Sequence, residues 1–253
     1  LLQGRVILIY NGSPYAVILP VTIFDFISSP EDINLNYHFS NLLKVLRVIS
    51  MVITLLLPGL YMAITVYHRE LIPTELLYSI VATRVTVPFP ILLEVLMMEL
   101  SFELIREAGL RVPSPLGSTV GIVGALVLGE AAVSANIVSP ILIIIIAITA
   151  ISSFAIPDFS LSFHLRLSRF AYTILGALCG FLGIATGLFL HVLTLCSLKS
   201  FGVPYLSPYA PISQKRNQTY LLKPVWKREK RADFLNTKKP NVQDKISMKW
   251  REK

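Results

Sequence analysis

Charged side chains are scarce in this sequence. They make up 15% of its 253 residues, whereas hydrophobic residues make up 54%, and the mean hydropathy is +0.65. A soluble globular domain carries charges at about a quarter of its positions. The shortage of charge therefore excludes an ordinary soluble domain and indicates a membrane protein.

Residues that carry chemistry are also scarce. The two cysteines, Cys179 and Cys196, lie in one apolar stretch, about 25 Å apart on a continuous helix, which is too far for a disulfide. There is no CxxC or Cys–His cluster, phosphate loop or nucleophile–base pair, so we expect no metal, no cofactor and no enzymatic activity. The chain starts at a leucine without a signal peptide, and we expect it to be a piece of a longer protein.

The N-terminal residues predict a β-hairpin. Two β-branched runs within Gly4–Val21 flank Asn11-Gly12, a dipeptide that favours tight turns. A lone hairpin is marginally stable, so we interpret residues 1–40 as the remnant end of a cytosolic domain. Residues 41–199 are expected to form a transmembrane domain, and residues 200–253 a basic cytosolic tail.

The fold class that these patterns predict is an all-α polytopic membrane protein with about four transmembrane helices. The expected spans are Leu42–Tyr67, Gly117–Ala135, Val138–Ile156 and a stretch within Arg169–Leu198. Four spans place both ends of the chain on the cytoplasmic side, together with Lys44, Arg47, Lys199 and the tail.

The apolar window Val87–Leu110 differs from these spans. Its charged residues Glu99, Glu103, Arg106 and Glu107 share one side, which predicts an amphipathic helix at the membrane interface. A fifth span is the alternative. Glu94 projects from its apolar side as an intramembrane carboxylate, and an ion pair with Arg84 or Arg106 is at least as good an explanation as a role in conduction.

Small residues predict where helices pack. Four glycines in the last span, spaced 4, 3 and 4, form a groove for another helix: Gly176, Gly180, Gly183 and Gly187. In the second span a ridge of small residues recurs every four positions: Gly117, Gly121, Ala125 and Gly129.

The side of the second span opposite its ridge predicts a pore. The pore-lining candidates are Val120, Val123, Val127, Glu130 and Ser134, because rings of valines gate by dewetting and rings of carboxylates favour cations. The alternative is that Glu130 simply reaches the interface near Pro140 or a bound water.

The C-terminal tail is strongly basic. From Lys215 onward it has 13 Lys or Arg and 4 Asp or Glu, a net charge of +9, whereas the rest of the chain has −1. Next to a membrane helix such a tail meets anionic lipid first, so we expect a lipid surface or a partner domain and no nucleic acid.

Several segments together resemble the A subunit of GerA-type spore germination receptors, over the chain from Leu1 to about Leu235. They include "VPFPILLEVLMMELSFELIREAGLRVP", "VGIVGALVLGEAAVSANIVSP", "SSFAIPDFSLSFHLRLSRF" and "LKSFGVPYLSPYAP". The resemblance implies a multi-pass protein of the inner spore membrane that works with a transporter-like, germinant-binding B subunit and a lipoprotein C subunit. It further implies a homo-oligomeric ring that conducts ions when nutrients bind. Compared with the family, we expect nearly all of the N-terminal cytosolic region to be absent from this sequence, which starts at its last hairpin.

Two functions remain open from the sequence. The first is a subunit of a germinant-gated cation channel whose ion release triggers germination. The alternative is a non-conducting membrane scaffold that anchors and clusters the germinant-binding subunit.

Overall fold

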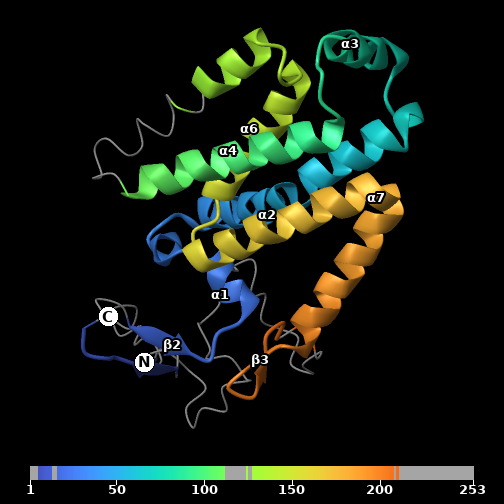
Figure 1. Ribbon diagram of the computed structural model, residues 1–253. Coiled ribbons are helices and arrows are strands. Elements are labelled where there is room, and N and C mark those ends of the chain that lie inside the picture. Colours follow the sequence, from blue (N-terminus) through green and yellow to red (C-terminus); the bar gives the residue numbers. More distant parts are fainter. Residues whose placement is uncertain (1–4, 13–15, 112–123, 125–126, 208, 211–253) are drawn as a thin grey trace, which may run out of the picture. The chain divides into compact units, whose positions relative to one another are not determined.

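The structure is a computed structural model, which describes the chain except residues 1–4, 13–15, 112–123, 125–126, 208 and 211–253. The chain divides into two compact units (Figure 1). The first combines Leu1–Val45 with Leu190–Lys253, and the second is Leu46–Phe189. Helices α2 (Tyr37–Val66) and α7 (Phe159–Ser197) each contribute residues to both units.

The predicted N-terminal hairpin is present in the first unit. Strands β1 (Val6–Leu8) and β2 (Val17–Leu19) pair antiparallel, and Gly12 in the connection has a φ of 91°. Helix α1 (Ile23–Ile27) and the 3₁₀ helix η1 (Pro30–Ile33) follow. Each starts with a capping box, in which Asp25 accepts the N–H of Thr22 and Asp32 that of Ser29.

A second hairpin, which the sequence analysis missed, follows α7. Strands β3 (Lys199–Ser200) and β4 (Val203–Pro204) are joined by Phe201 and Gly202, which both have positive φ. This segment packs on the N-terminal one: the N–H of Ile23 donates to the carbonyl of Tyr205 at 3.1 Å, and the ring centroids of Phe24 and Tyr209 are 5.0 Å apart. Residues from before and after the long helices therefore form one unit.

The second unit is helical. Besides most of α2 and α7 it contains the 3₁₀ helix η2 (Arg69–Leu71), α3 (Thr74–Arg84), α4 (Ile91–Arg111), a helix that includes residues 127–134, and α6 (Pro140–Phe154). Its main core cluster draws on α2, α4 and α6 through Met62, Val95 and Leu142, each 1% exposed or less.

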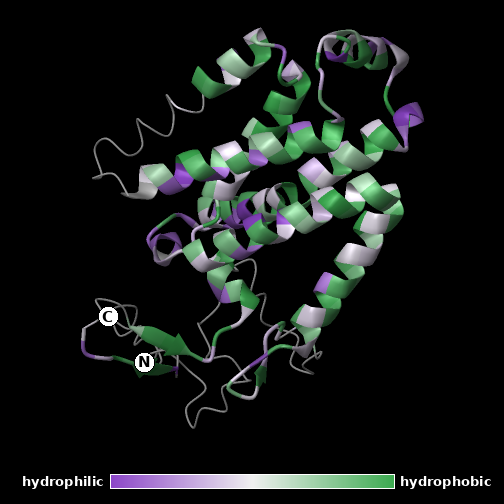
Figure 2. Ribbon diagram, in the orientation of Figure 1, coloured by the Kyte–Doolittle hydropathy of each residue, from purple (hydrophilic) through white to green (hydrophobic). Residues whose placement is uncertain are grey.

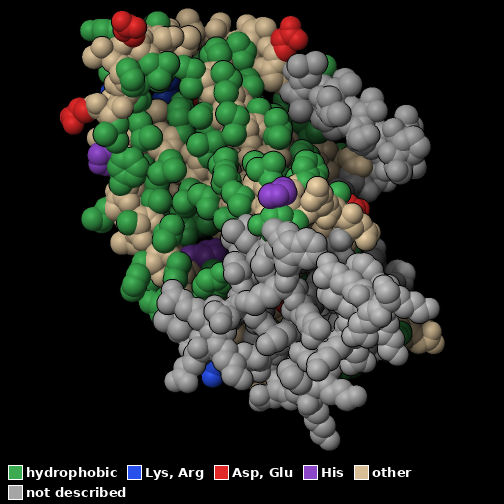
Figure 3. Space-filling view, turned by 180° about the vertical axis from the view of Figure 1, so that it is seen from behind, with side chains coloured by type: hydrophobic (Ala, Val, Ile, Leu, Met, Phe, Trp, Pro, Cys, Tyr) green, Lys and Arg blue, Asp and Glu red, His purple; other side chains and the backbone are tan. Residues whose placement is uncertain are grey.

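Hydrophobic residues also cover much of the outside of the helices. Green segments alternate with few purple ones along α6 and α7 (Figure 2), and apolar side chains dominate the described surface in the space-filling view (Figure 3). Two helices, α2 and α7, are long and apolar enough to cross a membrane. Helix α6 has 15 residues, about 22 Å, and is shorter than a full span. Of the predicted span Gly117–Ala135, residues 117–123 and 125–126 lie outside the described residues, and residues 127–134 are helical.

Helix α7 differs from the continuous span that the sequence predicts. It begins at Phe159, ten residues before Arg169, and is broken at Gly180, whose φ of 60° and ψ of −139° are not helical. The hydroxyl of Tyr67 donates to the carbonyl of Leu178 at 2.5 Å, next to this break. Glycine accepts a positive φ without the steric cost that a side chain would add.

The break changes what the four glycines of α7 do. Gly176 lies against Gly59 of α2 so closely that a Cβ on it would overlap the Gly59 carbonyl oxygen. Beyond the break, Gly183 and Gly187 pack against Leu175 of the preceding half of the same helix. The four glycines therefore do not form one continuous groove: Gly176 serves a neighbouring helix, and the later two let α7 fold back on itself.

Candidate functional site

A row of buried charges runs along α4 in the second unit. Glu94 is 0% and Glu99 1% exposed, and Arg166 and Arg169 of α7 are also buried. Ions in a protein interior persist only when they are paired and hydrogen-bonded. The partners of each acid therefore show how the helices are held together.

Glu94 joins three elements. Its Oε2 lies 3.3 Å from a terminal guanidinium nitrogen of Arg84 at the end of α3, and its Oε1 accepts the backbone N–H of Ser139 at 2.5 Å. Ser139 is the N-cap of α6, where a negative charge interacts favourably with the helix dipole. Of the two partners considered for Glu94, the structure selects Arg84, and the geometry gives Glu94 a structural role.

Glu99 and Glu103 face α7. The Nε of Arg169 lies 3.3 Å from Oε1 of Glu99, and the hydroxyl of Thr173 lies 3.4 Å from the same oxygen. Glu103 pairs with Arg166. The later acid of α4, Glu103, pairs with the earlier arginine of α7, Arg166. The two helices therefore run antiparallel here. The other carboxylate oxygen of Glu99 is buried and has no hydrogen-bond partner among the described residues.

Helix α4 turns Glu99 and Glu103 toward α7, whereas Glu107, which the sequence analysis placed on the same side, is exposed. The side that carries Glu99 and Glu103 packs toward the arginines of α7, whereas Leu100 and Leu104 are exposed. Arg106 continues the inward side, with its guanidinium carbon 4.1 Å from the ring centroid of Phe154. With 21 residues the helix is about 31 Å long, so its length does not confine it to the interface.

Sequence reasoning missed the arginines of α7 as partners. Arg166, Arg169 and Thr173 are spaced 3 and 4 residues apart, which places them on one helical face, and Glu99 and Glu103 are 4 apart. The similar spacing of acids on one helix and arginines on the other is the feature of the sequence from which the ion pairs could have been predicted.

The described part of the proposed pore helix has two different sides. Val127, Glu130 and Ser134 are exposed, whereas Gly129 and Ala132 are buried. A Cβ built on Gly129 would lie 3.6 Å from Ile143 of α6, an ordinary contact distance. The exposed side includes three of the five pore-lining candidates.

Other predicted residues lie outside the part of the chain that the structure describes: Val120, Val123, Gly117, Gly121 and Ala125. Within the described part, no three or more His, Cys, Asp or Glu residues group where they could hold a metal ion. Cys179 and Cys196 are free and exposed.

The sequence of this chain is similar to those of known proteins. The family model "Bacillus/Clostridium GerA spore germination protein" matches residues 1–234. Spore germination protein KA of Bacillus subtilis is 46% identical over 237 residues, which are 93% of this chain and 44% of that protein. GerLA of Bacillus cereus is 41% identical over 97% of this chain and 50% of its own length.

A further relative is named a membrane protein. YfkQ of Bacillus subtilis, called an uncharacterized membrane protein, is 41% identical over 89% of this chain and 44% of its own length. No solved structure matches. The chain thus spans about half the length of the curated relatives it matches. With the family model covering nearly all of its residues, this chain belongs to the GerA family of spore germination proteins.

Proposed function

We propose that this chain is the membrane part of a receptor A subunit that oligomerises into a germinant-gated cation channel in the inner membrane of the spore. The observation that carries the proposal is the two-sided helix at residues 127–134. Gly129 rests on α6, whereas Glu130 points away from the core. A carboxylate on an otherwise apolar helix is most favourable where it meets water or a cation, as in a pore.

The proposed partners are those that the resemblance to the family implies. They are a transporter-like B subunit that binds the germinant and a lipoprotein C subunit, and the proposal assigns this chain no enzymatic step. Residues 41–199 are the membrane domain of the proposal, and the basic residues from Lys215 onward are proposed to bind anionic lipid or a partner domain.

An even number of membrane crossings is supported by the first unit. The segment before α2 and the segment after α7 share a backbone hydrogen bond from Ile23 to Tyr205, and the N–H of Val21 donates to the Oγ of Ser200 at 3.1 Å. Segments in contact lie on the same side of a membrane. This favours four spans over five, with α4 packed against α7 through its charges.

The channel is tested by ion release from spores that carry the complete receptor. Glu130→Gln removes the charge and keeps the shape, and we expect slower cation release after germinant addition because a ring of carboxylates attracts cations. Val127→Ala widens the path, and we expect release at lower germinant concentration or without it.

Matched controls are Glu75→Gln on the exposed side of α3 and Val192→Ala on the exposed side of α7. Both should leave ion release unchanged. If Glu130→Gln and Val127→Ala behave like these controls in spores with normal receptor levels, the pore assignment is wrong.

The scaffold is the second candidate. It needs tight helix packing, such as the close contact of Gly59 with Gly176, but no water-filled path. Cysteine accessibility from Thr119 to Ser134 separates the two functions. A pore gives a water-accessible stripe at helical period through Val120, Val123, Val127, Glu130 and Ser134, and a scaffold gives uniform protection.

A further inference from the structure

A cavity of about 340 Å³ lies between the end of α2, η2, α3 and the start of α4. This volume is at the lower end of the range for small-molecule sites. The lining is apolar except for one threonine and two arginines, and it contains no acid: Thr65, Arg69, Ile72, Leu77, Ile80, Val81, Arg84, Val85 and Ile91.

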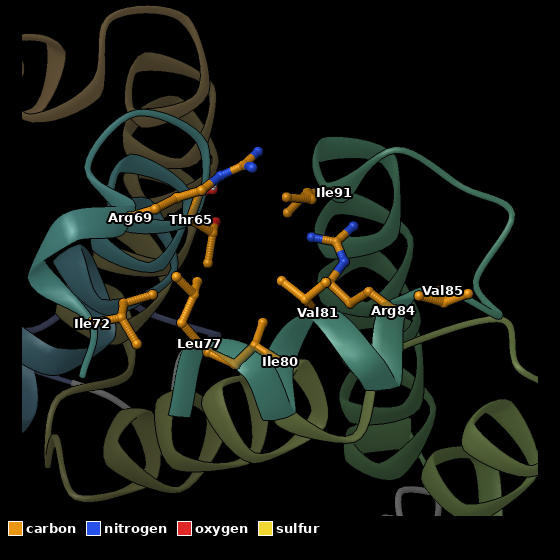
Figure 4. A pocket seen from close by; sticks show the side chains of 9 residues that line it. All are labelled: Thr65, Arg69, Ile72, Leu77, Ile80, Val81, Arg84, Val85 and Ile91. Carbon is orange, nitrogen blue, oxygen red and sulfur yellow. Dashed lines mark hydrogen bonds between the residues drawn. The ribbon is translucent and has the colours of Figure 1, made fainter. Parts of the chain in front are cut away.

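The two guanidinium groups give the cavity its chemistry. Figure 4 shows those of Arg69 and Arg84 directed to one side, with Ile72, Leu77 and Ile80 along the other. Each arginine has five N–H donors. Arg69 uses its Nε on the carbonyl of Thr65 at 2.8 Å, and Arg84 uses one terminal nitrogen on Glu94. Their remaining donors have no partner among the described residues.

The charge of the site matches a single anion. Arg84 is neutralised by Glu94, which is fully buried behind it, so one uncompensated positive charge remains on Arg69. Arginine is well suited to phosphate because its donors are fixed in one plane. A monoanionic phosphate is therefore the complement of this pair.

The surroundings distinguish a lipid from a soluble anion. The cavity starts at the last turn of α2, an apolar helix long enough to span a membrane. The ends of a helix that spans a bilayer lie near the lipid headgroups. Large apolar side chains are exposed around it, with Tyr78 77% and Val85 79% exposed. Basic pockets beside membrane helices commonly bind lipid headgroups.

We propose that this cavity binds the phosphate of an anionic phospholipid. Arg69 and Arg84 contact the phosphate, and the apolar lining contacts the adjoining hydrocarbon part of the lipid. All residues that line the cavity lie between Thr65 and Ile91, so the site does not include the basic tail. The proposal does not depend on ion conduction by the chain.

The test measures binding of short-chain phosphatidylglycerol and phosphatidylcholine to the purified full chain in detergent, by native mass spectrometry. Arg69→Gln is chosen because Arg69 is exposed, whereas changing Arg84 would leave Glu94 buried without its partner. A basic residue near an anionic lipid contributes about a fivefold gain in affinity, so Arg69→Gln should weaken phosphatidylglycerol binding about fivefold. Val81→Asp, which places a negative charge in the lining, should weaken it at least as much.

Two controls make the effect specific to the cavity. Ser79→Asp adds the same charge to an exposed position of α3 outside the lining, and Arg47→Gln removes the same charge at the other end of α2. Both should bind like the unchanged chain, and phosphatidylcholine should bind more weakly than phosphatidylglycerol throughout.

Equal binding of the two lipids, or equal loss in the control variants, would overturn the proposal. A further arm uses inorganic phosphate alone. If phosphate binds at the same concentrations as the lipid and depends equally on Arg69, the site serves a soluble anion and the lipid assignment fails. The proposal stands if phosphate neither binds nor displaces the lipid.

Discussion

Replacing Arg169 by methionine is predicted to destabilise the helical unit strongly. Its Nε lies 3.3 Å from Oε1 of Glu99, and both side chains are buried. Without the guanidinium, the carboxylate keeps only the Thr173 hydroxyl, 3.4 Å away. Leaving a buried charge without its partner costs about 3–5 kcal/mol, so we expect a loss of this size in the free energy of unfolding.

A double variant distinguishes a lost ion pair from a lost side chain. Glu99→Leu combined with Arg169→Met removes both charges and keeps apolar atoms in their place. Replacement of a whole buried pair by hydrophobic residues is often neutral or stabilising. The double variant should therefore regain most of the stability that Arg169→Met loses, because no charge is left without a partner.

The assay is thermal unfolding of the purified full chain in detergent. For a protein of this size each kcal/mol shifts Tm by about 2–4 °C, so Arg169→Met should lower it by about 6–20 °C. Glu75→Gln is the control, because Glu75 is exposed, and its Tm should change little. A Tm of Arg169→Met equal to that of the control would contradict this prediction. So would a double variant whose Tm is no higher than that of Arg169→Met.

The remaining predictions concern the contact of α2 with α7. Gly176→Ala should lower the Tm by more than Gly187→Ala. The new Cβ of Gly176→Ala would overlap the backbone carbonyl of Gly59, whereas that of Gly187→Ala would meet the movable end of the Leu175 side chain. Equal shifts in Tm would contradict this. Tyr67→Phe removes the donor to the Leu178 carbonyl and should cost about 1 kcal/mol of unfolding free energy, and an unchanged denaturation midpoint would show that the hydroxyl does not hold the break in α7.

Local signals predicted the local structure well. Asn11-Gly12 predicted the first hairpin, and apolar runs predicted α2 and the C-terminal part of α7. The second hairpin was missed because its strands have only two residues each and its turn, Phe201-Gly202, has a bulky residue at a positive φ. Such a conformation is uncommon for a bulky residue, so composition alone does not indicate it.

The break in α7 was not predictable from spacing. Gly176, Gly180, Gly183 and Gly187 recur at helical intervals, and such a pattern is equally typical of a continuous packing face. Which glycine leaves the helix depends on tertiary contacts: Tyr67 bonds the Leu178 carbonyl, and a Cβ on Gly180 would lie 3.1–3.2 Å from atoms of Tyr67 and His68. These residues come from the end of α2, more than a hundred positions earlier.

The charged side of α4 shows why periodicity alone does not locate a polar surface. The pattern of Glu99 and Glu103 establishes that two faces differ, but what each face meets depends on the arginines of α7, more than sixty residues later. In lipid the stable arrangement has its charges inside and its leucines outside. Glu94, Glu99 and Glu103 all follow this arrangement and have an arginine each. Glu130 is exposed and has no arginine among the described residues, so the pairing that holds the three acids of α4 does not extend to it in this part of the chain.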